Sequence, residues 1–174
     1  MPDTTLSQAL KEAYAAAPDS VVAYHTLEIY HPSFTQPIRV VRDFVDLQAT
    51  LESTAPRDAS QSVTFIGFGF DIVPPEVSAT GVPQCQITID NVSRDIVANL
   101  ELAIASNQPI TVIYRLFLSS DLSAPQNNPP MTLTIISMSA DVFKVTATAT
   151  FGDLVNKRFP SQMYTTDRFP GLVP

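Results

Sequence analysis

The sequence of 174 residues is poor in the residues from which many active sites are built. It holds one cysteine (Cys85), two histidines, five glycines and no tryptophan. A single cysteine excludes an internal disulfide bond. So few glycines leave little material for a phosphate-binding loop, and neither a G-x-S-x-G nucleophile elbow nor a C-x-x-C pair occurs. The common sequence signatures of nucleotide hydrolysis, acyl transfer and zinc binding are therefore missing.

Charge is scarce as well, and most of it is negative. Charged residues make up 16% of the chain, and the net charge is −7. The ten lysines and arginines are scattered, with only Lys157 and Arg158 adjacent. Nucleic acids and anionic membrane surfaces both bind to clusters of positive charge. We therefore expect neither nucleic acid nor a membrane as a partner.

Long hydrophobic runs are also absent. The first twenty residues have no basic stretch followed by a continuous apolar one, so they do not resemble a signal peptide. No window approaches the ~18 uninterrupted apolar residues of a membrane span. We expect the chain, residues 1–174, to fold as a single domain in a cytosol.

What the sequence does contain is a series of short apolar segments separated by 15 prolines. Alternation of apolar and polar residues predicts strands, and apolar stripes at helical spacing predict two helices. The first helix has a capping box at Thr5 and Gln8, and Ser93 caps the second. The strands are expected at 21–30, 37–44, 62–73, 84–90, 109–119, 131–139 and 141–151, and the helices at 4–17 and 93–107.

Three other segments have no clear periodicity. Residues 46–60 are polar and receive no assignment, and residues 119–130 are predicted to form a long exposed loop. Residues 152–174 are irregular but aromatic, so we expect them to pack on this domain or on a neighbour. The pattern as a whole indicates an α+β fold that is mostly β. An antiparallel β-sandwich or split barrel with an N-terminal helix and one flanking helix fits it best.

The two histidines lie in one stretch, His25 to Phe44, together with Glu28 and Asp43. A metal site needs three or four converging ligands. However, His25 and Glu28 are an odd number of residues apart, so on a strand they point to opposite faces. The stretch is better interpreted as two strands around the turn at His31-Pro32, in which the histidines make hydrogen bonds.

Nucleophilic and acid–base chemistry are equally weakly supported. Cys85 occupies an inward position in an apolar strand, whereas reactive thiolates lie near cations or helix N-termini. The acidic residues Asp43, Asp71, Asp90 and Asp95 fall at strand ends or at a helix start, where turns and caps account for them. We therefore predict no catalytic, cofactor-binding or metal-binding residue, and no enzymatic activity.

Several predicted strands are apolar on both faces, and apolar residues also occur near both ends of the chain. A domain of this size does not easily bury all of that surface alone. We therefore expect it to assemble with copies of itself or with other chains.

The run EAYAAAPDSVVAYHTLEIYHPSFTQPIRVVRDF resembles the start of a small uncharacterised family found in the tail gene clusters of long-tailed bacteriophages and prophages. That family has an alanine-rich helix ending in Ala-Pro, then Leu-Glu, His-Pro and Ile-Arg-Val. Here these elements are Ala15–Pro18, Leu27-Glu28, His31-Pro32 and Ile38–Val40.

Two further segments support the resemblance. ITIDNVSRDIV, residues 87–97, is similar to a segment of minor tail proteins of the lambda protein L type, and FPGL at 169–172 also fits. The resemblance implies a structural subunit of the tail tip or baseplate, with a fold of the tail-tube type. It brings no catalytic residues.

The resemblance also implies the setting. The subunit would be assembled in the cytoplasm of the host bacterium and lie in the virion tail, in a homo-oligomeric ring between the tube, distal tail and hub proteins. The expected contact elements are the N-terminal helix, the loop 119–130 and the segment 152–174. The alternative is a soluble β-sandwich that binds host-surface carbohydrate or a receptor, which would require aromatic residues exposed on a loop or face.

Overall fold

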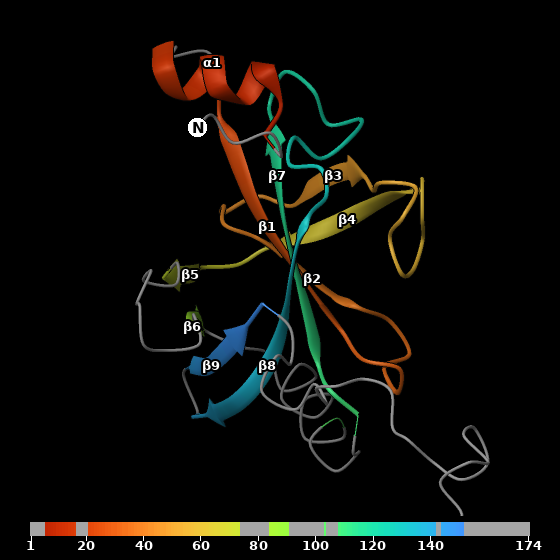
Figure 1. The fold of residues 1–174 in the computed structure, drawn as a ribbon, viewed down its shortest axis with the longest axis vertical. Helices are drawn as coiled ribbons and strands as arrows, with labels where there is room; N and C mark the ends of the chain where they lie inside the picture. The colour runs from red at the N-terminus through yellow and green to blue at the C-terminus, as the bar shows by residue number, and fades with distance from the viewer. Residues whose placement is uncertain are drawn as a thin grey trace, which may run out of the picture.

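The computed structural model describes residues 6–16, 21–73, 84–90, 103, 108–141 and 144–151. This part of the chain is mostly β, with one α-helix and nine strands (Figure 1). The elements are α1 (Gln8–Ala16), β1 (Ala23–Tyr30), β2 (Ile38–Val41), β3 (Leu47–Thr50), β4 (Ser62–Gly67), β5 (Phe70–Val73), β6 (Gln84–Asp90), β7 (Thr111–Leu118), β8 (Met131–Ala140) and β9 (Lys144–Thr150). The predicted fold class, mostly β with an N-terminal helix, is confirmed at this level.

The N-terminal helix is shorter than predicted. It begins at Gln8 rather than at residue 4, because Ser7 caps it: the Ser7 Oγ accepts a hydrogen bond from the Leu10 amide at 3.1 Å. Thr5, the predicted cap, lies outside the described residues. The second predicted helix, 93–107, is outside them too except for Ala103, which is buried. The segment 152–174 is likewise outside.

Strand β3 lies inside the polar segment 46–60, which the sequence left unassigned. Leu47 and Ala49 of this strand are buried while Gln48 is exposed, and the strand pairs with β4. Four residues are too few for alternation to stand out from a polar background. Its pairing with β4, which no local pattern reports, holds it in place.

All strands belong to one sheet in the order β3-β4-β2-β1-β7-β8-β9-β6-β5. The predicted hairpin of β1 and β2 is confirmed. The expectation of a wholly antiparallel sheet is wrong at one point, because β2 and β4 run parallel. Strand β2 also ends at Val41, earlier than the predicted residue 44, so Asp43 and Phe44 lie in the following loop.

The segment 62–73 was expected to be one strand, but it is divided between the two ends of the sheet. Its first half, β4, pairs with β3 and β2, and its second half, β5, pairs with β6. At the division, the Phe68 amide donates to Val41 O at 3.0 Å, and Gly69 O accepts from the Asp90 amide at 2.9 Å. The segment 62–73 therefore forms strands near one end of the sheet and at the other end.

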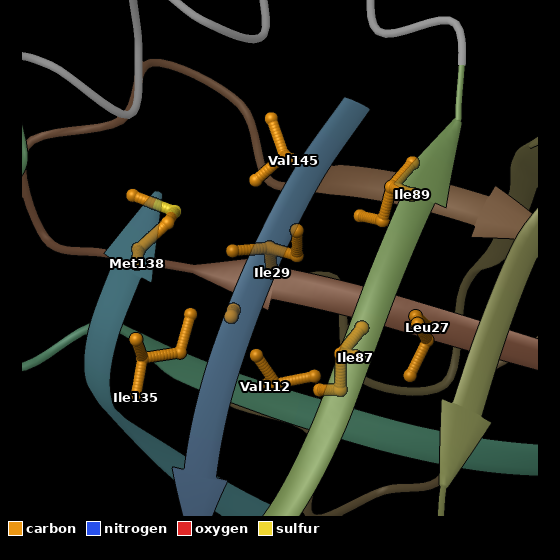
Figure 2. Close-up of a pocket in the computed structure, with 9 residues that line it drawn as sticks. Leu27, Ile29, Ile87, Ile89, Val112, Ile135, Met138 and Val145 are labelled. Carbon is orange, nitrogen blue, oxygen red and sulfur yellow. The ribbon is translucent and has the colours of Figure 1, made fainter. Parts of the chain in front are cut away.

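The sheet curls over itself to form its main core. Leu27 and Ile29 of β1 line the same small cavity as Ile87 and Ile89 of β6, and Figure 2 shows these side chains between the two layers. Strands β7, β8 and β9 separate β1 from β6 in the sheet, so in a flat sheet β1 and β6 would be about 19 Å apart. The cavity measures only ≈ 10 Å³, so the two layers are closely packed.

Strands β1 and β7 pair along their length through the middle of the sheet (Figure 1). Apolar side chains from other elements pack on both faces of this pair. On one face, Leu10 of α1 packs with Leu116 and Leu118. On the other, Phe117 packs against Phe65 of β4, with ring centroids 5.9 Å apart. Both faces of β7 therefore carry buried apolar side chains, which explains why nearly all of its residues are hydrophobic.

The loop 119–130 is less exposed than predicted. Gln126 and Asn127 are buried, and the Asn127 side chain bonds to the backbone of Tyr114 and Leu116 in β7. The Ser7 amide donates to Gln126 O at 2.8 Å. The second half of this loop thus attaches α1 to the sheet.

Gly67 and Gly69 provide a matched test of the segment that holds both ends of the sheet. A Cβ at Gly67 would lie 3.0 Å from backbone atoms of Asp43, Phe44 and Val45, whereas a Cβ at Gly69 would meet nothing within 4 Å. We expect Gly67→Ala to lower the free energy of unfolding by about 1–3 kcal/mol, because backbone must move. Gly69→Ala should leave it within about 1 kcal/mol of the wild type. Urea unfolding of both variants measures this, and equal effects would show that the contact at Gly67 does not matter.

Candidate functional site

His25 lies on β1, where its Nδ1 is 2.6 Å from the Tyr114 hydroxyl of β7. Burial lowers the pKa of His25, and the nearby Arg42 guanidinium lowers it further. Burial also raises the pKa of Tyr114. At neutral pH His25 is therefore uncharged and the tyrosine keeps its proton. The pair is a hydrogen bond between two neutral groups inside the sheet.

His31 lies just beyond the end of β1 and has different neighbours. Its Nδ1 is 2.6 Å from Ser33 Oγ and accepts a hydrogen bond from the Ser33 amide, and its ring packs on Phe34. Six residues of extended chain place the two histidines about 20 Å apart. Across the described ranges, no three His, Cys, Asp or Glu residues are grouped so that they could hold a metal ion.

Cys85 is fully buried in β6, within the apolar core. Burial raises the pKa of its thiol, so at neutral pH the sulfur keeps its proton. Such a group is a poor nucleophile. Its position matches the inward one expected from the sequence.

The acidic candidates do not come together either. Asp43 Oδ1 accepts a hydrogen bond from the Phe44 amide at 2.6 Å, which stabilises a turn. Asp71 faces Arg42 at 3.7 Å on the surface, and Asp90 is exposed at the end of β6. Asp95 lies outside the described residues. The acids that the structure places thus have separate surroundings.

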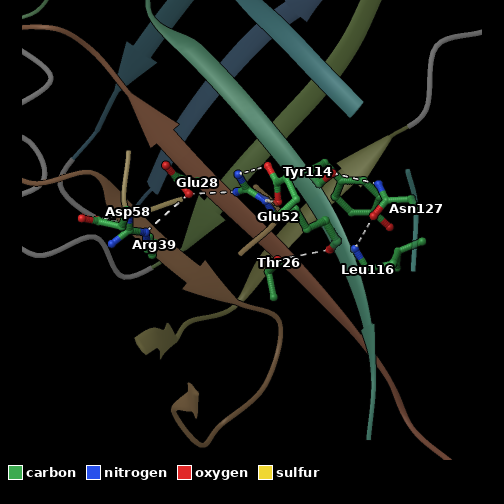
Figure 3. A network of polar contacts seen from close by, with 9 residues as sticks. Thr26, Glu28, Arg39, Glu52, Asp58, Tyr114, Leu116 and Asn127 are labelled. Carbon is green, nitrogen blue, oxygen red and sulfur yellow. Dashed lines mark hydrogen bonds and ion pairs between the residues drawn. The ribbon is translucent and has the colours of Figure 1, made fainter. Parts of the chain in front are cut away.

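The most extensive polar cluster is one that the sequence did not single out as a site (Figure 3). Arg115 of β7 is completely buried and binds two carboxylates. Its Nε and Nη2 each lie 2.8 Å from an oxygen of Glu52, and its Nη1 lies 2.8 Å from Glu28 Oε2. Arg39 of β2 extends the chain of contacts, at 3.4 Å from Glu28 and 2.7 Å from Asp58.

The cluster has an excess of negative charge. Three carboxylates share two guanidinium groups, and Glu28 Oε1 is buried without a hydrogen-bond partner. Asp58 and Ser60 have positive φ angles of 52° and 60°, in the left-handed region that few residues adopt. The loop after β3 therefore bends sharply while Glu52 and Asp58 reach the arginines. The ion pairs of the cluster connect β1, β2, β7 and the loop after β3, which suits a structural role better than proton transfer.

One signal in the sequence could have revealed this cluster. Arg115 interrupts the run ITVIYRLFL, where every neighbour within two positions except Tyr114 is aliphatic or aromatic without a polar group. A charge in such a strand is almost never buried without an opposite charge beside it. The run thus predicts buried acidic partners, although not which acids.

Comparison with known families decides one point. The model of a domain of unknown function (DUF1833) matches residues 9–164. The chain belongs to this family. None of the curated proteins matches the sequence. The matched range contains every strand described above and the whole charge cluster.

In this member of DUF1833, one loop also presents two adjacent apolar side chains to water. We call residues 43–46, between β2 and β3, the Phe44 loop. Phe44 is completely exposed and Val45 is 70% exposed. The loop is nonetheless fixed, because Asp43 bonds to the Phe44 amide and Asp46 Oδ1 accepts from the Gly67 amide at 2.9 Å. The close contact at Gly67 adds to this support.

No helix in the described residues is long and apolar enough to cross a membrane.

Removing the central arginine tests the charge cluster. Arg115→Leu leaves Glu28 and Glu52 facing each other in an apolar interior, so we expect a loss of roughly 3–5 kcal/mol in the free energy of unfolding. The double variant with Glu28→Leu should recover part of that loss. Arg42→Leu is the matched control, since its ion pair with Asp71 is half exposed and contributes at most about 1 kcal/mol. Equal losses for Arg115→Leu and Arg42→Leu would contradict the assignment.

The depressed pKa of His25 predicts a pH dependence of stability. Below its unfolded pKa of about 6.5, the unfolded chain binds a proton that the folded chain resists. Stability is therefore complete above pH 6.5 and falls as the pH drops toward the lowered folded pKa. We expect His25→Gln, which does not titrate, to lose less stability than the wild type between pH 7.5 and pH 5 in urea unfolding. Parallel pH profiles would show that His25 does not contribute.

Proposed function

We propose that the chain is a structural subunit of a bacteriophage tail tip or baseplate and joins the tail tube to the hub or central fibre. The observation that carries this proposal is the Phe44 loop, which holds a phenylalanine and a valine in water by fixed backbone contacts. Exposed apolar groups on a rigid support suit contact with another protein. The charge cluster supports the strand that leads into this loop, since Arg39 of β2 contacts Glu28.

The arrangement of the sheet supports a fold of the tail-tube type. The sheet curls until β6 covers β1, and the segment of β4 and β5 bonds to both ends of it. We propose that this is a split barrel, or an equivalent sandwich, with α1 on its flank. The second flanking helix is part of the same proposal.

The residues that carry the resemblance to phage tail proteins have structural roles in this chain. Glu28 belongs to the charge cluster, His31 fixes the turn after β1, and Ile38–Val40 form most of β2. A family defined by such residues would share an architecture. We infer a place in the virion tail beside tube, distal tail and hub proteins, reached by assembly in the host cytoplasm.

A second candidate function follows from the same loop. A soluble binding module for host-surface carbohydrate or a receptor needs an exposed aromatic side chain, and Phe44 provides one. Sugar rings stack on such side chains, although tryptophan and tyrosine also offer a polar group and phenylalanine does not. The loop 119–130, by contrast, contains no aromatic residue.

Deleting the coding sequence from a phage or prophage that encodes the chain separates the two functions. If the chain is structural, the lysate should contain heads and incomplete tails under the electron microscope, and expression of the chain in trans should restore infectivity. If it is a binding module, tails should look complete but the particles should fail to adsorb to cells. Complete, adsorbing and infectious particles would contradict both functions.

A further inference from the structure

A pocket lies at the end of the molecule where β7 begins. It has a volume of ≈ 270 Å³ and is formed by the residues before β7 and by the middle of β8. Its lining combines the polar residues Gln108 and Ser137 with Ala103 and five larger apolar residues: Pro109, Ile110, Ile135, Ile136 and Met138. Ile136 is 59% exposed because the pairing of β8 with β9 shifts register between Ile135 and Ser137. Such a bulge turns a side chain away from its regular position.

The pocket and the Phe44 loop cannot meet within one molecule. The loop begins near the start of β1, since the Arg42 amide donates to His25 O and His25 pairs with Leu116. The pocket lies beyond the other end of β7, at Ile110. Six residues of strand separate these levels, which is about 20 Å. The Phe44 loop of one copy can therefore meet the pocket only of another copy.

We propose that Phe44 and Val45 of one copy insert into the pocket of the next. A cavity of ~150 Å³ lined by aliphatic side chains accepts a benzene molecule. The pocket here is larger, at ≈ 270 Å³, so it has room for a phenyl ring and an isopropyl group together. Asp43 and Asp46 flank the two apolar residues and remain at the rim, in water.

The charges near the loop argue for this occupant over two others. A loop-to-loop contact between two copies would bring four carboxylates together, from Asp43 and Asp46 of each. An anionic membrane is opposed by the same carboxylates and by the net charge of −7. A contact between the loop of one copy and the pocket of another keeps the two sets of loop carboxylates apart.

A contact of this kind joins two different surfaces, so it repeats from copy to copy. Heterologous interfaces close into rings when the rotation between copies allows it. This inference rests on the proposed function only for the place of the ring in a tail. The interface itself can be measured on the purified chain.

The test combines one variant of each surface. Phe44→Asp removes the apolar aromatic side chain of the loop, and Ile136→Asp places a negative charge in the pocket. Both side chains are exposed, so both variants should fold, as circular dichroism and thermal unfolding would verify. By light scattering across a dilution series, we expect the wild type to exceed the one-chain mass of 18.9 kDa and each variant to show that mass. An equimolar mixture should form 1:1 heterodimers and nothing larger, because one working loop then meets one working pocket.

Val22→Asp is the matched control, since Val22 is 51% exposed and belongs neither to the Phe44 loop nor to the pocket lining, and it should assemble like the wild type. Ser137→Arg is a second pocket variant that blocks the space by bulk instead of charge, in case Ile136→Asp does not fold. A wild-type chain at the one-chain mass at every concentration would overturn the proposal and assign the loop to a different protein. Variants that assemble normally, or a mixture that does not pair, would overturn it as well. Defective phage tails together with a monomeric wild-type chain would reject this interface and leave the proposed function intact.

Discussion

The buried guanidinium of Arg115 is the constraint on which the rest of the described structure depends. An arginine with no exposure needs compensation for its charge, and the structure supplies it from β1 and from the loop after β3. Those contacts fix how β1, β2 and β7 lie against the loop that carries Glu52 and Asp58. The face of β7 that holds Arg115 also holds Phe117, so the ion pairs and the second apolar core stabilise the same surface.

The Phe44 loop is a consequence of that arrangement. Strand β2 enters the charge cluster through Arg39 and ends at Val41, and the chain then turns over Gly67 before β3 begins. Because β4 lies between β2 and β3 in the sheet, the connection from β2 to β3 crosses the end of β4 at Gly67. Its apolar residues are left outside by the geometry of the sheet. The proposed interface uses a surface that the fold produces in any case.

The sequence predicted those strands in which the alternation of apolar and polar residues agrees with the face that the sheet buries. In β9, Val145, Ala147 and Ala149 are buried as the alternation over 141–151 predicts, whereas Phe151, predicted on the same face, is 44% exposed. The hairpin at His31-Pro32 formed where expected. The features that the sequence did not predict depend on contacts between residues far apart in the chain. Strand β3 depends on β4, the segment 62–73 divides because its two halves have different neighbours, and Arg115 finds Glu52 and Glu28 at separations of 63 and 87 residues. No window of sequence contains such partners.

The distance between Glu28 and Arg115 has a consequence for synthesis. At about 5–20 residues per second, the ribosome delivers Arg115 roughly 4–17 s after Glu28, which stands 87 residues earlier. During that interval β1 lacks β7, the strand that pairs with it along its whole length, and no second layer covers the side chains of Leu27 and Ile29. Until β7 is made, the apolar side chains of the nascent β1–β2 hairpin are open to contact with other chains.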